Sequence, residues 1–216
     1  AGVSERHICV IPNGLDLMLF RPLPERGRFR DRWGIPKDGL MVLFVGRLDR
    51  NKAPDVLVEA FHRLSVPDSY LAIVGPDDGL ASELRQVITN HGSGDRVIIT
   101  GPLPTDREVF EALRDADIFV LPRRLQSFGM AILEACAMSC PMVLSEGCDN
   151  ADAFRDRAAR VVPVDAAAMA AGIEELLGDA ALRGRMGAEG LGILERDFTL
   201  PAVALRLESL YEAVRG

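Results

Sequence analysis

The chain has 216 residues, of which 48% are hydrophobic and 26% are charged, and its formal net charge is −7 at pH 7. This length is enough for one well-buried domain or for two small ones. The acidic balance argues against a surface for nucleic acid or anionic lipid, because both need clustered basic residues. It leaves room for a local basic pocket that binds one small anion.

The chain lacks the sequence signals of secretion, membrane insertion and zinc binding. It has no signal peptide and no run of eighteen apolar residues, so we expect no transmembrane segment. Cys136 and Cys140 lie four residues apart on one predicted helix, where buried thiols are expected. None of the four cysteines has CxxC spacing, so we expect no metal site and a reducing, cytoplasmic location.

Short apolar runs alternate with helical patterns along the chain. Several runs, such as MVLFVG and DIFVL, are apolar at nearly every position. Strands without polar alternation are typical of a parallel sheet that helices cover on both faces. The predicted strands are residues 8–11, 41–46, 70–75, 96–100, 118–121, 141–145 and 160–162.

Apolar residues recur at helical spacing at 56–64, 109–113, 132–137, 169–177 and 203–214, and we expect a helix over each of these stretches. Thr105 and Glu108 form a capping-box pattern at the start of one predicted helix. The tail from Leu182 onward is also predicted to be helical and to brace the domain. The alternation predicts an α/β fold, a doubly wound and Rossmann-like parallel sheet. We expect one domain over 1–216, with a lead-in at 1–40, a core at 41–178 and C-terminal helices at 179–216.

Sheets of this kind bind ligands in the crevice beyond the carboxyl ends of their strands. The loop after the strand at 41–46 reads GRLDRNK. Gly46 permits a tight turn there, and Arg47 and Lys52 supply two cations that can neutralise a diphosphate. Two solvated loop cations are the alternative interpretation of this segment.

A second candidate segment follows the strand at 118–121, where a helix is predicted to begin near Phe128 and Gly129. The unpaired amides of Gly129, Met130 and Ala131 would face the crevice and bind an anion. Glu134 lies about 7.5 Å further along the helix, within reach of the ribose of the same nucleotide. An exposed position is the alternative for Glu134, but its neighbours are almost all apolar or small, and a carboxylate among them needs a partner.

Five segments in order resemble the C-terminal domain of the group 1 (family 4) retaining glycosyltransferases. They are PNGLD at 12–16, FVGRLDRNKAPDVLVEAF at 44–61, RVIITG at 96–101, ADIFVLP at 116–122 and SFGMAILEACAMSCPMV at 127–143, and LRGRMG at 182–187 continues the likeness. The resemblance implies one half of a two-domain GT-B enzyme that transfers a sugar from a nucleotide diphosphate sugar. It implies no cofactor and no obligatory metal, and we expect a UDP- or GDP-linked donor.

The resemblance also assigns roles to residues of this sequence. It implies that Arg47 and Lys52 bind the diphosphate and that Glu134 binds the ribose. It further implies that the helix-start amides meet phosphate or sugar and that backbone near Ile98, Ile99 and Gly101 lies by the base. Gly46, Ser127 and Phe128 belong to the same implied donor site, and Arg47, Lys52, Gln126 and Glu134 form its implied catalytic set.

The sequence departs from the family pattern at three places. The family has glutamates at both ends of a motif in which this chain has Gln126 and Glu134, so a negative charge facing the donor sugar is absent. Gln126 can still accept and donate hydrogen bonds. Lys52-Ala53 stands where the family has lysine-glycine. The family's Gly-Gly-x-Pro-Glu stretch is replaced by GCDNA at 147–151, from which we assign no site residue.

Our main hypothesis is a donor-binding domain of a glycosyltransferase whose N-terminal acceptor domain is not in this sequence. That domain would hold any side-chain base and any peripheral membrane contact, and the fragment alone should be inactive. The second hypothesis is a nucleotide-sugar-binding or assembly module whose catalysis has decayed, with Gln126 as its mark. A dinucleotide dehydrogenase is disfavoured, because GxGxxG follows none of the predicted strands.

Overall fold

The structure is a computed structural model that describes residues 8–215. Its centre is a six-stranded sheet in which every neighbouring pair of strands is parallel. The order across the sheet is β3-β2-β1-β4-β5-β6. The strands are β1 (Leu40–Val45), β2 (Ser69–Val74), β3 (Val97–Gly101), β4 (Ile118–Leu121), β5 (Met142–Ser145) and β6 (Ala159–Val162). The predicted doubly wound α/β fold is confirmed.

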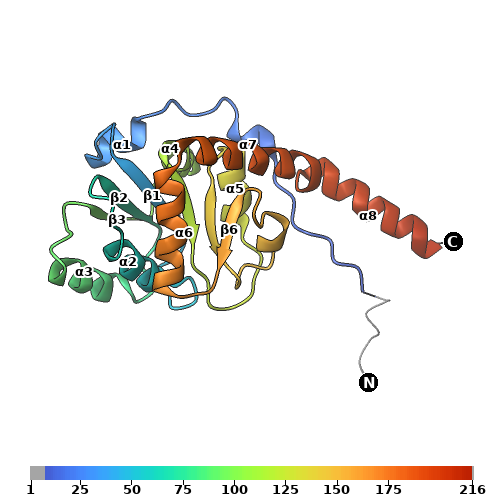
Figure 1. The fold of residues 1–216 in the computed structure, drawn as a ribbon. Coiled ribbons are helices and arrows are strands. Elements are labelled where there is room, and N and C mark those ends of the chain that lie inside the picture. Colours follow the sequence, from blue (N-terminus) through green and yellow to red (C-terminus); the bar gives the residue numbers. More distant parts are fainter. Residues whose placement is uncertain (1–7, 216) are drawn as a thin grey trace, which may run out of the picture.

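Helices cover both faces of this sheet (Figure 1). Contacts join α2 to α3 and α6 on one side, and α4 to α1 and α5 on the other, where α7 also packs on α5. The helices are α1 (Arg28–Trp33), α2 (Pro54–His62), α3 (Ala81–Asn90), α4 (Asp106–Asp115), α5 (Met130–Ala137), α6 (Ala166–Gly178), α7 (Ala180–Asp197) and α8 (Leu200–Arg215), with short 3-10 turns η2 (Leu17–Phe20) and η3 (Ala151–Ala153).

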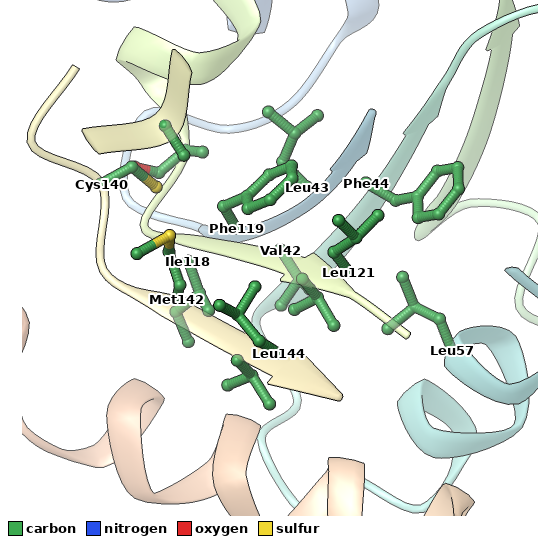
Figure 2. Close-up of a cluster of buried hydrophobic side chains, with 14 of the residues drawn as sticks. Val42, Leu43, Phe44, Leu57, Ile118, Phe119, Leu121, Cys140, Met142 and Leu144 are labelled. Atoms are coloured by element: carbon green, nitrogen blue, oxygen red, sulfur yellow. The ribbon is translucent and has the colours of Figure 1, made fainter. Parts of the chain in front are cut away.

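The core keeps the carboxyl ends of β1 and β4 side by side. Figure 2 shows side chains of β1, β4 and β5 interleaved, with Leu57 of α2 closing one side. Leu43, Phe44 and Phe119 are all fully buried. Cys136 and Cys140 are buried as expected, and burial raises the pKa of both thiols. These thiols are therefore core groups without acid–base chemistry at neutral pH. The prediction that both cysteines lie on one helix is wrong, because α5 ends at Ala137.

The strand order places a topological switch point between β1 and β4. The chain leaves β1 toward β2 and leaves β4 toward β5, so the two following loops diverge. Diverging loops leave a crevice at the carboxyl edge of a parallel sheet, and ligands of such folds bind there.

One predicted strand is wrong. Residues 8–11 form no strand, and Ile8 and Val10 are 58% and 85% exposed. This segment lies beside α8, with which it lines a pocket. Within residues 8–215, no strand pairs with it. A short apolar run forms a strand only where a neighbouring strand satisfies its backbone groups.

The two C-terminal helices differ in how they meet the domain. α7 packs on α5 and braces the core as expected. α8 has no buried residue and extends away from the sheet, leaving Leu205, Tyr211 and Val214 exposed (Figure 1). Within residues 8–215, no helix combines the length and the apolar character needed to cross a bilayer.

Candidate functional site

A cavity of about 390 Å³ lies at the switch point between β1 and β4. This volume is within the usual range of small-molecule sites. The cavity brings together most of the predicted donor-site residues from the two candidate loops. Its lining residues are Val45, Gly46, Arg47, Lys52, Leu121, Arg123, Phe128, Gly129, Met130, Ala131 and Glu134.

The first wall of the cavity is the loop that follows β1. The amide of Gly46 donates to the Val74 carbonyl at 2.9 Å, and a side chain on Gly75 would collide with the Gly46 carbonyl. The ends of β1 and β2 therefore approach more closely than side chains would allow. Beyond Gly46, the amide of Lys52 donates to Asp49 Oδ1 at 2.8 Å, which closes the loop and fixes where Lys52 begins.

Arg47 and Lys52 both line the cavity, but their surroundings differ. The side chain of Arg47 is 63% exposed and pairs with Asp49 at 3.6 Å and Asp78 at 3.3 Å. Lys52 is half-buried, and no ion pair of the described residues includes it. Burial lowers the pKa of Lys52, and the nearby charge of Arg123 lowers it further. Lys52 is thus the less compensated of the two predicted cations.

Ala53 has a left-handed backbone conformation, with φ at +51°. It stands at the position where the resembling family has glycine, and it precedes the first residue of α2. Residues other than glycine adopt this conformation at a cost of about 1–2 kcal/mol. Alanine at this position therefore places backbone strain next to Lys52.

Arg123 is a cavity residue that sequence analysis missed. It is only 5% exposed, and its Nε and Nη1 atoms are buried without a hydrogen-bond partner. Its neighbour Arg124 instead turns outward, pairs with Asp55 at 2.6 Å and donates to the Arg50 carbonyl. The two arginines follow one apolar strand, and the sequence does not distinguish them. The available signal was a pair of arginines that follows a fully buried strand after one proline.

The backbone of Arg123 is held by the end of β5 and by the loop that follows it. Ser145 Oγ accepts from the Arg123 amide at 2.7 Å and donates to the Arg123 carbonyl at 2.9 Å. A side chain on Gly147 would collide with that same carbonyl. The close approach of these two loops fixes the base of the Arg123 side chain.

The second wall is the start of α5, which begins at Met130 after Gly129. Three free amides are predicted at this helix start, and the prediction is wrong for Gly129. The Gly129 amide donates to Asn150 Oδ1 at 3.0 Å, and Asn150 Nδ2 donates back to the Gly129 carbonyl at 3.3 Å. The amides of Met130 and Ala131 lie in the first turn, where a helix offers them no acceptor. Asn150 belongs to the GCDNA segment, from which sequence analysis assigned no residue.

Glu134 lines the cavity from the second turn of α5. Burial raises the pKa of its carboxyl, and the negative charge of Asp106 raises it further. No described side-chain hydrogen bond or ion pair involves Glu134. The alternative of a merely exposed helix position is therefore wrong, because a half-buried carboxyl without a protein partner faces the cavity.

The remaining predicted residues lie outside this cavity. Gln126 is exposed, and the Ser127 carbonyl accepts the amide of Asp149 at 3.2 Å. Ile98, Ile99 and Gly101 lie on β3, two strands away from β1. Contact of these residues with a sugar or a base stays a prediction.

Residues 25–191 match the family described as glycosyl transferases group 1. The chain belongs to this family. D-inositol 3-phosphate glycosyltransferases are similar over most of the chain: that of Acidothermus cellulolyticus is 36% identical over 72% of this chain and 36% of its own length. That of an Arthrobacter species is 35% identical over 96% of this chain and 51% of its own length. The chain thus spans about a third to a half of these relatives.

Solved structures of other proteins share the fold. Sucrose-phosphate synthase from Thermosynechococcus elongatus is 30% identical, with a TM-score of 0.78 over 94% of this chain and 52% of its own. The Anabaena protein HepE, solved with UDP and glucose, has a TM-score of 0.86 over 98% of this chain and 59% of its own. HepE is 19% identical, so its likeness concerns the fold alone. The resemblance predicted from the sequence is confirmed at the level of the family and the fold.

Proposed function

We propose that this chain is the donor-binding half of a retaining glycosyltransferase that uses a nucleotide diphosphate sugar. The observation that carries the proposal is the cavity at the switch point, where Lys52, Arg123 and the start of α5 converge. Cations and a helix N-terminus at one crevice suit a diphosphate. A UDP- or GDP-linked donor is proposed, in line with the UDP bound in the structure of HepE.

Each part of the cavity has a role toward such a donor. Arg47, Lys52 and the amides of Met130 and Ala131 would hold the diphosphate. A charge-assisted contact from half-buried Lys52 stabilises it by about 1.5–3 kcal/mol, and the contact from exposed Arg47 contributes less. Glu134 would accept hydrogen bonds from the ribose hydroxyls, which supplies the partner that its carboxyl lacks in the protein.

The chemical contribution of the chain is electrostatic. When the bond between the anomeric carbon and the leaving phosphate oxygen breaks, negative charge grows on the diphosphate and positive charge on the sugar. The cavity cations stabilise the first of these charges in place, without a metal or cofactor. The leaving phosphate can take the proton of the acceptor hydroxyl on the face from which it departs, so the configuration of the sugar is retained.

The acceptor is assigned to a further domain of the same polypeptide. The relatives are two to three times as long as the segment that they share with this chain, which leaves room for a second domain. This domain would bring the acceptor, any side-chain base and any peripheral contact of a cytoplasmic enzyme with a membrane. The chain alone is expected to bind the donor but to transfer no sugar.

A thermal-shift panel tests the proposal on the chain as it stands. UDP, GDP and ADP are each compared with their nucleosides over a range of ligand concentrations. We expect the melting temperature to rise with the logarithm of the concentration of one diphosphate, well above its dissociation constant. The absence of any shift, together with no heat in calorimetry at millimolar ligand, would overturn the proposal.

A further inference from the structure

We propose that Arg123 binds the donor diphosphate together with Lys52, and contributes more to this binding than Arg47. The inference rests on the proposed function and deepens it. Arg123 was not among the residues implied by the sequence. Its assignment depends on burial, lack of a partner and placement in the described structure.

The first observation is an uncompensated buried charge. Arg123 is 5% exposed, and its Nε and Nη1 atoms have no hydrogen-bond partner. A guanidinium does not lose its proton in a protein, so burial cannot be relieved by neutralisation. Within residues 8–215, no carboxylate forms an ion pair with it, although a buried charge needs one. An anion in the cavity would supply that partner.

The second observation is that neighbouring residues fix the position of the Arg123 backbone. Ser145 binds both the amide and the carbonyl of Arg123, and only a glycine at 147 lets the two loops approach. The adjacent Arg124 is instead satisfied by Asp55 on α2. Arg124 therefore forms an ion pair with Asp55, whereas Arg123 lines the cavity and has two donor atoms without a protein partner.

The third observation is the balance of charge around the cavity. Lys52 and Arg123 are close enough for each to oppose the charge of the other, which contributes to the lowered pKa of Lys52. The remaining cation, Arg47, is exposed and already paired with Asp49 and Asp78. Among the described residues that line the cavity, Glu134 has the single carboxyl, and burial raises its pKa. Two unpaired cations in one cavity fit a ligand with one negative charge on each of two linked phosphates.

The two phosphates of one diphosphate would then offset the Lys52–Arg123 repulsion. The fork of Arg123 can bind two oxygens at once, whereas Lys52 acts as a point charge. Because Arg47 must be drawn from two carboxylates in water, its net contribution is smaller. Affinity should therefore depend on Arg123 and Lys52 more than on Arg47.

The test compares Arg123→Gln with Arg124→Gln as the matched control. Calorimetry with UDP, GDP and inorganic pyrophosphate measures affinity for the unmodified chain and each variant, and Arg47→Ala is measured beside them. We expect Arg123→Gln to weaken the bound diphosphates about ten-fold or more. Arg124→Gln should stay within about two-fold and Arg47→Ala within a few-fold. The melting temperature of unliganded Arg123→Gln should equal or exceed that of the unmodified chain, since an unpaired buried charge is removed.

Arg123→Lys gives a second reading if Arg123→Gln does not fold. It keeps the charge without the fork, and we expect an affinity between those of the unmodified chain and Arg123→Gln. Equal affinity in the unmodified chain, Arg123→Gln and Arg124→Gln would overturn the inference alone. Equal losses in Arg123→Gln and Arg124→Gln would also overturn it. Binding of pyrophosphate but of neither nucleotide, lost in Arg123→Gln, would support an anion site while overturning the proposed function. Binding of none of the three ligands by the unmodified chain would overturn both.

Discussion

Asn150 accepts a hydrogen bond from the Gly129 amide at 3.0 Å and returns one to the Gly129 carbonyl at 3.3 Å. This reciprocal pair joins the loop after β5 to the residue that precedes α5. The Gly129 amide is therefore bonded within the protein, and the amides of Met130 and Ala131 remain at the wall of the cavity. The loop that departs from the family pattern therefore positions the start of α5.

Removing this clamp should cost both stability and affinity. Asn150→Ala leaves the buried amide of Gly129 without its partner, and we expect a loss of about 1–3 kcal/mol in the free energy of unfolding. Urea denaturation measures this loss, with Asp149→Ala on the exposed neighbour as the control. Nucleoside diphosphate affinity should fall in Asn150→Ala, because α5 is less well fixed. Unchanged stability in Asn150→Ala would show that the pair does not hold the helix start.

Glu134→Gln should weaken ribonucleotides while it stabilises the unliganded chain. The carboxyl accepts two ribose hydroxyls in our proposal, so affinity for a ribonucleoside diphosphate should fall by about 1–2 kcal/mol and that for its 2′-deoxy form far less. Calorimetry with both ligands measures the difference, with Glu208→Gln on exposed α8 as the control. Equal losses for the two ligands would assign Glu134 a structural role.

The stability effect of Glu134 has a defined pH dependence. Burial raises the pKa of its carboxyl in the folded chain. Between the ordinary and the raised value the folded state holds more protons than the unfolded state, so this group lowers stability as pH rises. Glu134→Gln should therefore melt at a higher temperature than the unmodified chain at pH 7. The difference should shrink as pH falls from the raised value toward the ordinary value of 4.5, and it should be absent below that value. A difference that grows toward low pH would contradict the assignment.

The two cations of the β1 loop should not be equivalent. Lys52→Ala should weaken a diphosphate about ten-fold or more, because a half-buried cation without a partner is lost. Arg47→Ala should have a few-fold effect, since this exposed side chain already pairs with two carboxylates. Titrations at low and physiological salt check both variants. Salt should weaken binding in the unmodified chain and do so less in Lys52→Ala. If the affinity of the unmodified chain does not change with salt concentration, Lys52 and Arg47 do not bind the phosphates.

Much of the fold was predictable because alternating apolar strands and helical stripes are local signals. The prediction of a strand at 8–11 was wrong because a strand needs a neighbouring strand, which the local sequence does not reveal. α1 was missed because its stability depends on distant residues: Arg30 pairs with Asp117 at 2.7 Å, and Asp115 accepts the amides at the start of the helix. α3 was missed because its buried stripe is narrow and lies among polar residues.

The site was predictable where the rule for carboxyl ends of strands applied. It located the β1 loop and the start of α5, which the structure brings to one cavity. It did not separate Arg123 from Arg124, because their difference depends on Asp55, 69 residues away from Arg124 in sequence. Nor did it foresee that Asn150 binds the Gly129 amide across 21 residues.

Substitution of Gln126 distinguishes an enzyme that is adapted to an amide at this position from one whose catalysis has decayed. Gln126 is exposed and lies outside the cavity of this chain, so its proposed contact with the sugar belongs to the complete enzyme. If the enzyme has adapted to an amide, Gln126→Glu in the full-length protein should leave turnover level or lower it. If catalysis has decayed, the added carboxylate should raise turnover ten-fold or more, since a well-placed charge in a closed site contributes about 2–4 kcal/mol. We expect the first result across several nucleotide sugars.

A crystal structure with the nucleoside diphosphate that gives the largest thermal shift tests the central claim most directly. We expect the diphosphate in the cavity between β1 and β4, within hydrogen-bond distance of Lys52, Arg123 and the amides of Met130 and Ala131. The ribose should lie against Glu134. A ligand bound elsewhere, or a diphosphate that leaves Lys52 and Arg123 without contact, would contradict the account.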